Sequence, residues 1–191
     1  IGALLGTQNV ELVTPQGQAR GAGVPFDPDR LRFFELLHKE LRSWPPVVRR
    51  SPERTPEATN TLAFFEAYFS NFIEGTEFEV KEAAAIVFDG VIPRGRPADA
   101  HDVLGTWRIV SDKAEMGKTP KTAAELIQHL RVRHAIIMSA RPDKRPGELK
   151  AEGNRAGSTV FVAPDLVQGT LERGFEFFQS LETPFARAVF M

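Results

Sequence analysis

The 191-residue chain contains no cysteine, which excludes disulfide bonds, thiolate catalysis and zinc sites with cysteine ligands. It also lacks an excess of charge of either sign. The net charge is −1, so overall electrostatics do not favour nucleic acid or a membrane surface as a partner. No apolar run approaches the length of a membrane-spanning helix. Together with the missing cysteines, this favours a cytoplasmic location.

Two common motifs of ligand chemistry are also missing from the sequence. It has neither a Gly-x-x-x-x-Gly-Lys-Ser/Thr phosphate loop nor a His-Glu-x-x-His metal motif. The four histidines are scattered, and His134 on an apolar helix face is better explained as a packed, hydrogen-bonded residue than as a base. The stretch from Arg131 to Arg155 contains seven basic residues and only three acidic ones. That stretch is either a solvated surface or an attractive region for acidic targets or nucleotide phosphates.

Hydrophobic spacing predicts a mainly α-helical chain with one small β element late in the sequence. The Gly-rich residues 1–25 could form an extended arm or a small hairpin. Thr122 and Glu125 have the spacing of a capping box, and Thr159–Val162 gives the best strand signal. Helices are predicted to begin near Asp27, Thr55, Glu79, Asp99, Thr122, Pro164 and Thr183.

A long helix is predicted from Thr55 to Gly75. Thr55-Pro56 supplies a cap and a first-turn proline, and Gly75 is suited to the position just past the end. We expect one face to pack against a core, because apolar residues recur on it at helical spacing: Leu62, Phe65, Phe69 and Phe72. Glu74 lies at the C-terminal end, where the helix dipole makes a carboxylate mildly unfavourable. No basic residue occurs between positions 61 and 80, so this carboxylate requires a positive partner elsewhere in the fold.

The end of this helix, Ser70-Asn71-Phe72-Ile73-Glu74-Gly75, resembles the inhibitory motif of Fic (Fido) proteins, Ser/Thr-x-x-x-Glu-Gly/Asn. Later segments are similar to that family in the same order: Pro146-Gly147, the flap strand before Pro164, and the Pro184-Phe185 helix start. The resemblance covers about residues 55–191. It implies a Fic-like helical bundle with an inhibitory helix at 55–75, a β-hairpin flap at about 153–163, and an N-terminal extension at 1–54.

The resemblance implies a self-inhibited protein adenylyltransferase. Such an enzyme transfers AMP from ATP, with Mg²⁺, to a Ser, Thr or Tyr hydroxyl of a protein target. The implied inhibitory residues are Ser70, Glu74 and Gly75. Glu74 would form a salt bridge with a catalytic-loop arginine and so block the ATP γ-phosphate, while Ser70 would help to hold the helix. The implied flap would pair with the main chain of the target, through Ser158, Thr159, Val160, Phe161 and Val162.

The sequence departs from the family in one important respect. The catalytic loop, His-Pro-Phe-x-Asp/Glu-Gly-Asn-Gly-Arg, is absent, so no catalytic residue is assigned. Gly153-Asn154-Arg155 is not its counterpart, because no His-x-Phe precedes it. Since the chain starts at Ile1 and ends in an apolar run, we expect a fragment truncated before that loop. The alternative is a non-catalytic regulatory or protein-binding module that retains the helix and flap. The sequence does not determine the target protein or which nucleotide is transferred. A homodimer is possible in either case.

Overall fold

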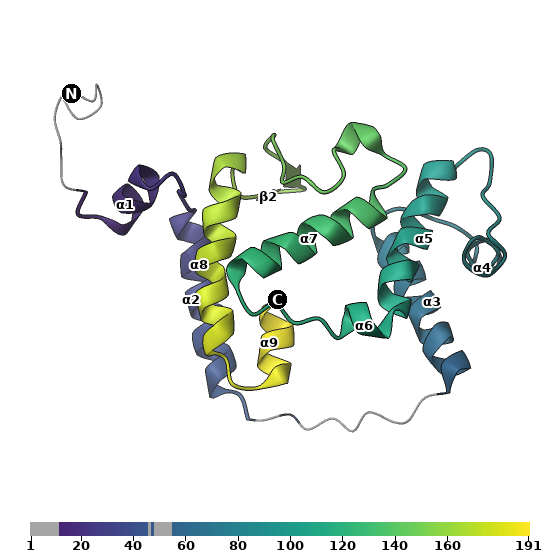
Figure 1. Cartoon of the computed structure of the whole chain (residues 1–191), viewed down its shortest axis with the longest axis horizontal. Coiled ribbons are helices and arrows are strands. Elements are labelled where there is room, and N and C mark those ends of the chain that lie inside the picture. Colours follow the sequence, from purple (N-terminus) through teal and green to yellow (C-terminus); the bar gives the residue numbers. More distant parts are fainter. Residues whose placement is uncertain (1–11, 46, 48–54) are drawn as a thin grey trace. The chain divides into compact units, whose positions relative to one another are not determined.

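The structure is a computed structural model that describes residues 12–45, 47 and 55–191, most of them helical (Figure 1). The prediction of a mainly α chain with a small β-hairpin is confirmed. In the described part of the chain, no helix is both long and apolar enough to cross a bilayer. The elements are α1 (Pro15–Gly21), α2 (Pro28–Ser43), α3 (Pro56–Ile73), α4 (Val80–Asp89), α5 (Pro97–Ser111), α6 (Lys113–Met116), α7 (Ala123–Ile137), η1 (Pro142–Lys144), β1 (Arg155–Ala156), β2 (Thr159–Val160), η2 (Pro164–Leu166), α8 (Val167–Ser180) and α9 (Pro184–Phe190).

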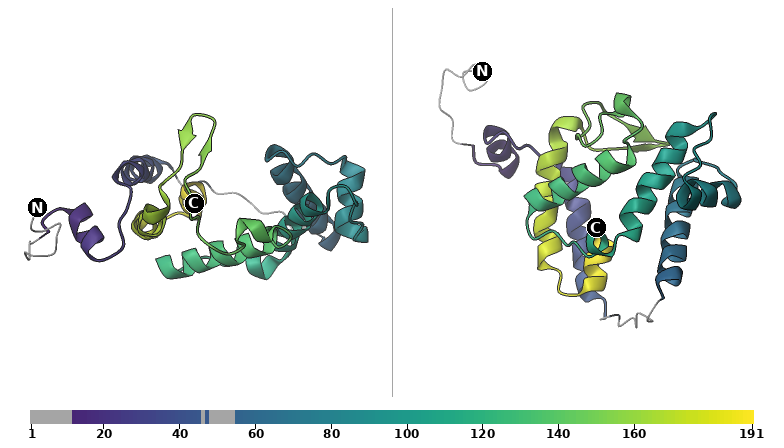
Figure 2. Two further views of the ribbon diagram at one scale, coloured as in Figure 1. Left: turned by 90° about the horizontal axis from the view of Figure 1, so that it is seen from above. Right: turned by 45° about the vertical axis from the view of Figure 1, so that its right-hand side comes forward.

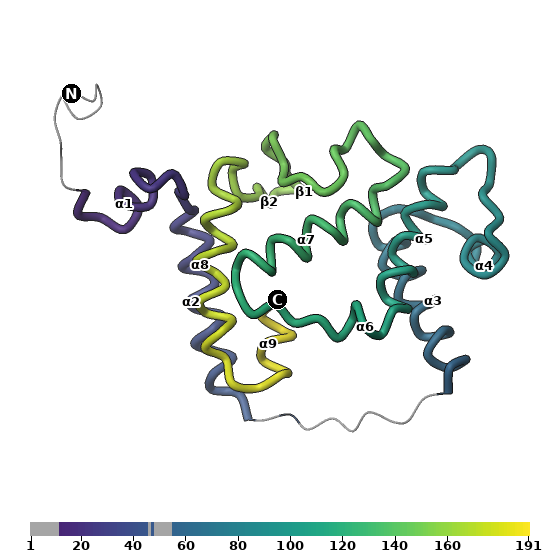
Figure 3. Tube along the Cα trace, in the orientation of Figure 1, coloured from purple at the N-terminus to yellow at the C-terminus, as the bar shows by residue number. Residues whose placement is uncertain are grey.

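The chain forms two compact units, and its path alternates between them (Figure 3). Unit 1 contains α1, α2, the hairpin, α8 and α9, whereas unit 2 contains α3 to α6, most of α7 and η1. Residues 12–45 and 47 of the predicted extension at 1–54 belong to unit 1. Helix α2 lies within that range, yet it packs on α8 and α9 from the other end of the sequence.

Unit 1 is built around the contact between α2 and α8, which lie side by side in Figures 1 and 2. Its core includes Leu41 of α2 and Leu181 at the end of α8, both buried. At Gly169 a Cβ atom would lie 2.3 Å from the carbonyl oxygen of Pro25, so the chain before α2 approaches the α8 backbone directly. Only glycine permits this approach.

The start of the chain differs from the prediction. An arm or hairpin was expected over residues 1–25, but the structure forms helix α1 at Pro15–Gly21, where Thr14 caps the first turn through a 3.1 Å bond from the Gly17 N–H. The proline at the first helical position favours this start. The remaining part of the expected arm, residues 1–11, lies outside the described residues.

Unit 2 is built on α5, which contacts α3, α4 and α6. Phe64 and Tyr68 of α3 and Val103 of α5 belong to one buried cluster. Helix α7 approaches α5 at Gly105, where an added Cβ atom would lie 2.9 Å from both the Ile136 oxygen and the Ile137 Cα atom. The α5–α7 contact is therefore made partly by backbone.

The face that α3 buries is not the predicted one. Leu62, Phe65, Phe69 and Phe72 are exposed. The buried residues are Ala63, Phe64, Ala67, Tyr68 and Asn71. Apolar residues surround most of this helix, so hydrophobic spacing alone could not choose the face. Ala63 and Ala67 share the buried side with Phe64 and Tyr68, and their small side chains let part of α3 approach its neighbours closely.

Other boundaries differ only slightly. Of the strand predicted at Thr159–Val162, only Thr159–Val160 pairs as a strand, although the Phe161 N–H also bonds to the Asn154 oxygen at 3.1 Å. At the start of α7, the Glu125 carboxylate accepts the N–H of Lys121 at 2.7 Å.

The α5–α7 contact yields the first prediction. Gly105→Ala should lower the free energy of unfolding by about 1–2 kcal/mol, because overpacking against backbone costs roughly 1–3 kcal/mol and the better helix propensity of alanine returns less than 1. Gly95→Ala is the control, since its Cβ atom would meet nothing within 4 Å. Urea unfolding measures both variants. Equal midpoints would show that α7 does not press on α5 at this glycine.

Candidate functional site

The end of α3 has a defined cap. The Gly75 N–H bonds to the Phe72 oxygen at 3.0 Å, and the Thr76 N–H bonds to the Asn71 oxygen at 2.9 Å. This pair of bonds is the Schellman arrangement, which needs a left-handed residue just past the helix. Gly75 supplies it with a φ of +91°. The predicted role of Gly75 in ending the helix is thus confirmed, and the cap fixes the backbone position of Glu74.

Asn71 connects this end of α3 to α5. It is buried, and its Nδ2 group donates to the Ala67 oxygen at 2.9 Å and to Thr106 Oγ1 at 3.1 Å. The Thr106 hydroxyl in turn donates to the Asp102 oxygen at 2.9 Å. Sequence analysis assigned the holding role to Ser70, whose side chain is exposed and makes no hydrogen bond within the described residues. Its predicted contact remains untested.

The Glu74 side chain is exposed and has no ion pair or hydrogen bond within the part of the chain that the structure describes. The positive partner predicted for it is therefore not among these residues. Since the cap fixes its backbone and no described neighbour holds its carboxylate, Glu74 presents a negative charge that is available to an incoming cation.

The loop after Glu74 is fastened to α5 by Arg96. Its guanidinium donates to the Glu77 backbone oxygen, lies 4.2 Å from the centre of the Phe78 ring and bonds to Asp99 at 3.0 Å. Tyr68 of α3 donates its hydroxyl to the Phe78 oxygen at 3.0 Å. The segment that carries Glu74 is thus held on both sides, by the helix before it and by this loop.

Arg141 extends the network by pairing with two carboxylates of α5. Its Nη2 atom lies 2.6 Å from Asp99 Oδ1 and 2.7 Å from Asp102 Oδ2, and its Nε atom donates to the same Asp102 oxygen at 2.9 Å. Hydrogen bonds to Asp102 and then Asp99 raise the pKa of Arg141. Burial alone would raise the pKa of Asp99, but bonds and charges from Arg96 and Arg141 outweigh it, so this pKa lies below its ordinary value.

The predicted flap is a two-stranded antiparallel hairpin in unit 1, seen as two short arrows in the left view of Figure 2. Arg155 pairs with Val160 and Ala156 with Thr159, around Gly157 with a φ of +57°. Val160 is 72% exposed and Phe161 43% exposed, so both side chains are accessible on the surface of the unit. An edge strand of this kind can pair with an extended segment.

Lys150 supports the base of the hairpin, a role that sequence analysis missed. Its ammonium group donates to the Asn154 side chain and lies 5.8 Å from the centre of the Phe161 ring. Lys150 therefore contacts both sides of the hairpin. Only the four-residue spacing between Lys150 and Asn154 could have suggested the first contact, and nothing in the sequence indicated the second.

Several of the basic residues and histidines have partners within the structure. Arg133 pairs with Glu115 at 3.0 Å and Arg145 pairs with Glu148, so much of the basic stretch is neutralised internally. His134 accepts the Gly147 N–H at Nδ1 over 3.0 Å, which confirms the predicted structural role. His38 lies 2.7 Å from the Ser180 hydroxyl, which itself donates to the Phe177 oxygen at 2.9 Å. The Ser180 hydroxyl therefore links the His38 ring to the backbone of α8.

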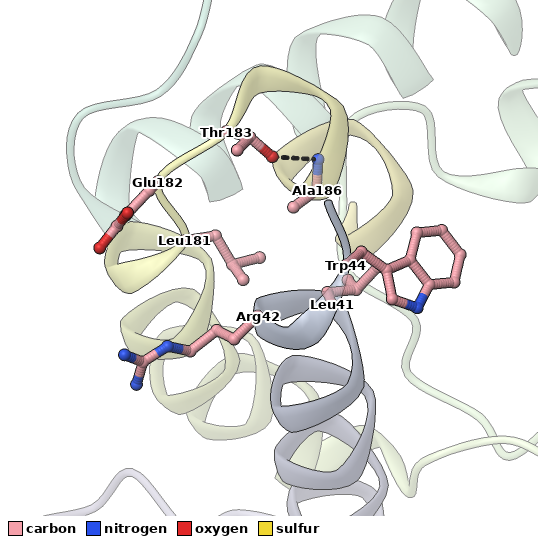
Figure 4. A pocket seen from close by; sticks show the side chains of 7 residues that line it. All are labelled: Leu41, Arg42, Trp44, Leu181, Glu182, Thr183 and Ala186. Carbon is pink, nitrogen blue, oxygen red and sulfur yellow. Dashed lines mark hydrogen bonds between the residues drawn. The ribbon is translucent and has the colours of Figure 1, made fainter. Parts of the chain in front are cut away.

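Unit 1 also has a pocket of about 300 Å³ between the end of α2 and the start of α9 (Figure 4). Leu181 points into it, while the charged ends of Arg42 and Glu182 point outward. Thr183 uses its hydroxyl to cap α9 through the Ala186 N–H at 3.1 Å. The polar groups that line the pocket do not converge on one point. The pocket therefore lacks the pattern of a specific ligand site.

Comparison with known proteins gives no relative. No protein-family model, no curated protein and no solved structure matches the chain. The residues predicted to be inhibitory lie in unit 2, and those predicted to form a docking flap lie in unit 1. A functional assignment therefore rests on the residues themselves and on the sequence resemblance.

The contrast between Asn71 and Ser70 can be tested directly. Asn71→Ala should destabilise the chain by about 1–3 kcal/mol, because it removes a buried bridge between α3 and α5. Ser70→Ala, the adjacent control, should change stability by less than about 0.5 kcal/mol because its side chain is exposed. Thermal and urea unfolding give both values. A larger loss in Ser70→Ala would transfer the holding role back to Ser70.

The Asp99 network predicts a loss of stability in acid. A carboxyl whose pKa is lowered by folding stabilises the protein above its unfolded pKa, about 3.9 for Asp, and this contribution is lost as the pH falls through the folded pKa. Asp99→Asn should therefore be less stable than wild type at pH 6, and the difference should shrink by pH 3. Asp143→Asn is the control, because its 3.2 Å pair with Lys144 is exposed on both sides. Urea midpoints at both pH values measure the effect. A constant difference between wild type and Asp99→Asn would contradict the assignment.

Proposed function

We propose that this chain supplies the inhibitory helix and the target-docking flap of a self-inhibited protein adenylyltransferase of the Fic type. The observation that carries the proposal is the state of Glu74. Its backbone is fixed by the Gly75 cap, its side chain is exposed, and it has no cationic partner among the described residues. An inhibitory carboxylate needs these properties, because it must reach a fixed position and bind an arginine supplied from outside unit 2.

The reaction explains why a carboxylate at that place inhibits. The oxygen of a target Ser, Thr or Tyr hydroxyl attacks the α-phosphorus of ATP, the bond to the β-phosphate breaks, and pyrophosphate leaves. The hydroxyl proton passes to a general base. An arginine on the γ-phosphate aligns the nucleotide for attack. When Glu74 holds that arginine, the γ-phosphate loses its partner and the α-phosphorus is not presented to the hydroxyl.

Several parts of this reaction are assigned to residues outside the chain. The base and the phosphate-binding loop have no counterpart in the sequence. In the regions that the structure describes, no three His, Asp or Glu side chains are grouped for a metal ion, so the proposal gives Mg²⁺ no ligand here. The contribution of this chain is regulation by Glu74 and docking by the flap, whose exposed Val160 and Phe161 would accompany main-chain pairing with the target.

A second candidate is a non-catalytic regulatory or protein-binding module that keeps the helix and the flap. The specific observation in its favour is that the catalytic-loop sequence is absent from all 191 residues. In this case Glu74 would bind a cationic partner without any effect on nucleotide transfer. The two candidates differ in whether the charge of Glu74 controls a reaction.

The test uses a longer form of the protein that carries a catalytic loop. Glu74→Ala should raise self-labelling from labelled ATP by roughly 5–150-fold, the usual range for release of a coupled site. Its ATP affinity, measured by calorimetry, should rise as well. Glu77→Ala is the matched control: it is a nearby exposed carboxylate whose contact with Arg96 is made by the backbone oxygen, which the substitution keeps.

Unfolding measurements distinguish a loss of inhibition from a loss of folding. Both alanine variants should unfold within about 0.5 kcal/mol of wild type, because neither side chain is buried. Labelling and ATP affinity that stay at the wild-type level in Glu74→Ala would remove Glu74 from any inhibitory role and favour the binding-module alternative.

A further inference from the structure

The side of α3 opposite its core carries an apolar stripe on the surface of unit 2. The stripe consists of Leu62, Phe65, Phe69, Phe72 and Ile73, with exposed fractions between 38% and 81%. Phe65 and Phe69 stack on each other with ring centres 5.9 Å apart. Single exposed apolar residues are common, but five large exposed side chains on one side of a helix are typical of an interaction site.

The spacing of the stripe indicates the shape of its partner. Leu62, Phe65, Phe69 and Phe72 are separated by three, four and three residues. This is the a/d spacing by which one helix packs along another, and amphipathic helices use it to enter apolar grooves. A strand would match it poorly, because side chains on one strand face repeat every two residues. The expected partner surface is therefore helical.

The charges beside the stripe indicate the chemistry of that partner. Glu66, Ser70 and Glu74 follow one another at four-residue intervals, so they form one row along the edge of the stripe. No basic residue occurs between Thr61 and Val80 to balance this row. A second copy of the chain would bring a like-charged row, and an anionic lipid surface would be repelled in the same way. A helix with lysine or arginine along one edge would be attracted.

We propose that the α3 stripe is a docking surface for an amphipathic helix of a partner protein, with large apolar residues on one face and basic residues beside them. The stripe supplies the buried area, and the row from Glu66 to Glu74 selects the charge of the partner. This inference does not depend on the proposed transferase function, because it requires neither nucleotide nor catalytic loop.

The test uses the whole 191-residue chain and a dye-labelled helical peptide of roughly 15 residues in which leucine and lysine alternate at helical spacing. Fluorescence anisotropy should show saturable binding, weaker at high salt. A peptide with glutamate in place of lysine should bind at least about tenfold more weakly. Ile73→Lys should lower the affinity by about tenfold or more, since it removes apolar area at a position that is 81% exposed and so should not disturb folding.

Two more variants test whether peptide binding depends on the acidic row and on the stripe itself. Glu66→Lys should reduce binding of the lysine peptide and reduce its salt dependence, while the unfolding midpoint stays unchanged. Leu36→Lys is the matched control, because Leu36 is a large apolar residue of α2, 59% exposed, in the other unit. It should bind like wild type.

Each other outcome overturns the proposal. Equal peptide binding by wild type and Ile73→Lys would show that the stripe is not the site. A concentration-dependent dimer in sedimentation that Ile73→Lys abolishes would assign the stripe to a second copy. Absence of peptide binding together with a lower melting temperature in Ile73→Lys would mean that the chain covers the stripe itself. None of these outcomes bears on labelling by Glu74→Ala, so this proposal and the proposed function can fail separately.

Discussion

The close contact between α3 and α5 determines most of what unit 2 presents to its surroundings. Ala63 and Ala67 are buried at four-residue spacing from Asn71, which bonds to Thr106 of α5 at 3.1 Å, and their small side chains allow a close approach on this side. Once these residues face α5, the large side chains on the other side of α3 must face outward. The same contact also fixes the direction in which α3 ends. The apolar stripe and the position of Glu74 are thus consequences of one packing choice.

Electrostatics then hold the segment after α3 without neutralising it. Arg96 uses its guanidinium on a backbone oxygen, an aromatic ring and Asp99, and Arg141 uses its own on two aspartates. Neither arginine forms an ion pair with Glu74. A carboxylate at a helix C-terminus gains nothing from the helix dipole. The contacts of Arg96 with the following loop hold the segment in place, so the Glu74 carboxylate does not have to contribute to its stability and remains available for a partner.

The hairpin of unit 1 follows a different principle. Its paired strands are only two residues long, and a hairpin this short is marginal by itself in water. Lys150 contacts both of its sides, and its exposed edge has unpaired backbone groups that an extended segment can use. A hairpin with so little internal pairing can change its conformation at low cost.

The sequence alone determined the helical class, most helix starts, the hairpin and the glycine that ends α3, because caps, prolines and turn residues act within a few positions of themselves. It also predicted that His134 is structural, which is confirmed, whereas the distant cation expected for Glu74 stays a prediction. It could not determine the buried face of α3, since apolar residues surround that helix and only its packing against α5 decides which side is buried. Nor could it find Asn71, Arg96, Arg141 or Lys150. Their roles depend on partners as far as 42 residues away, and only tertiary packing brings those partners within hydrogen-bond distance.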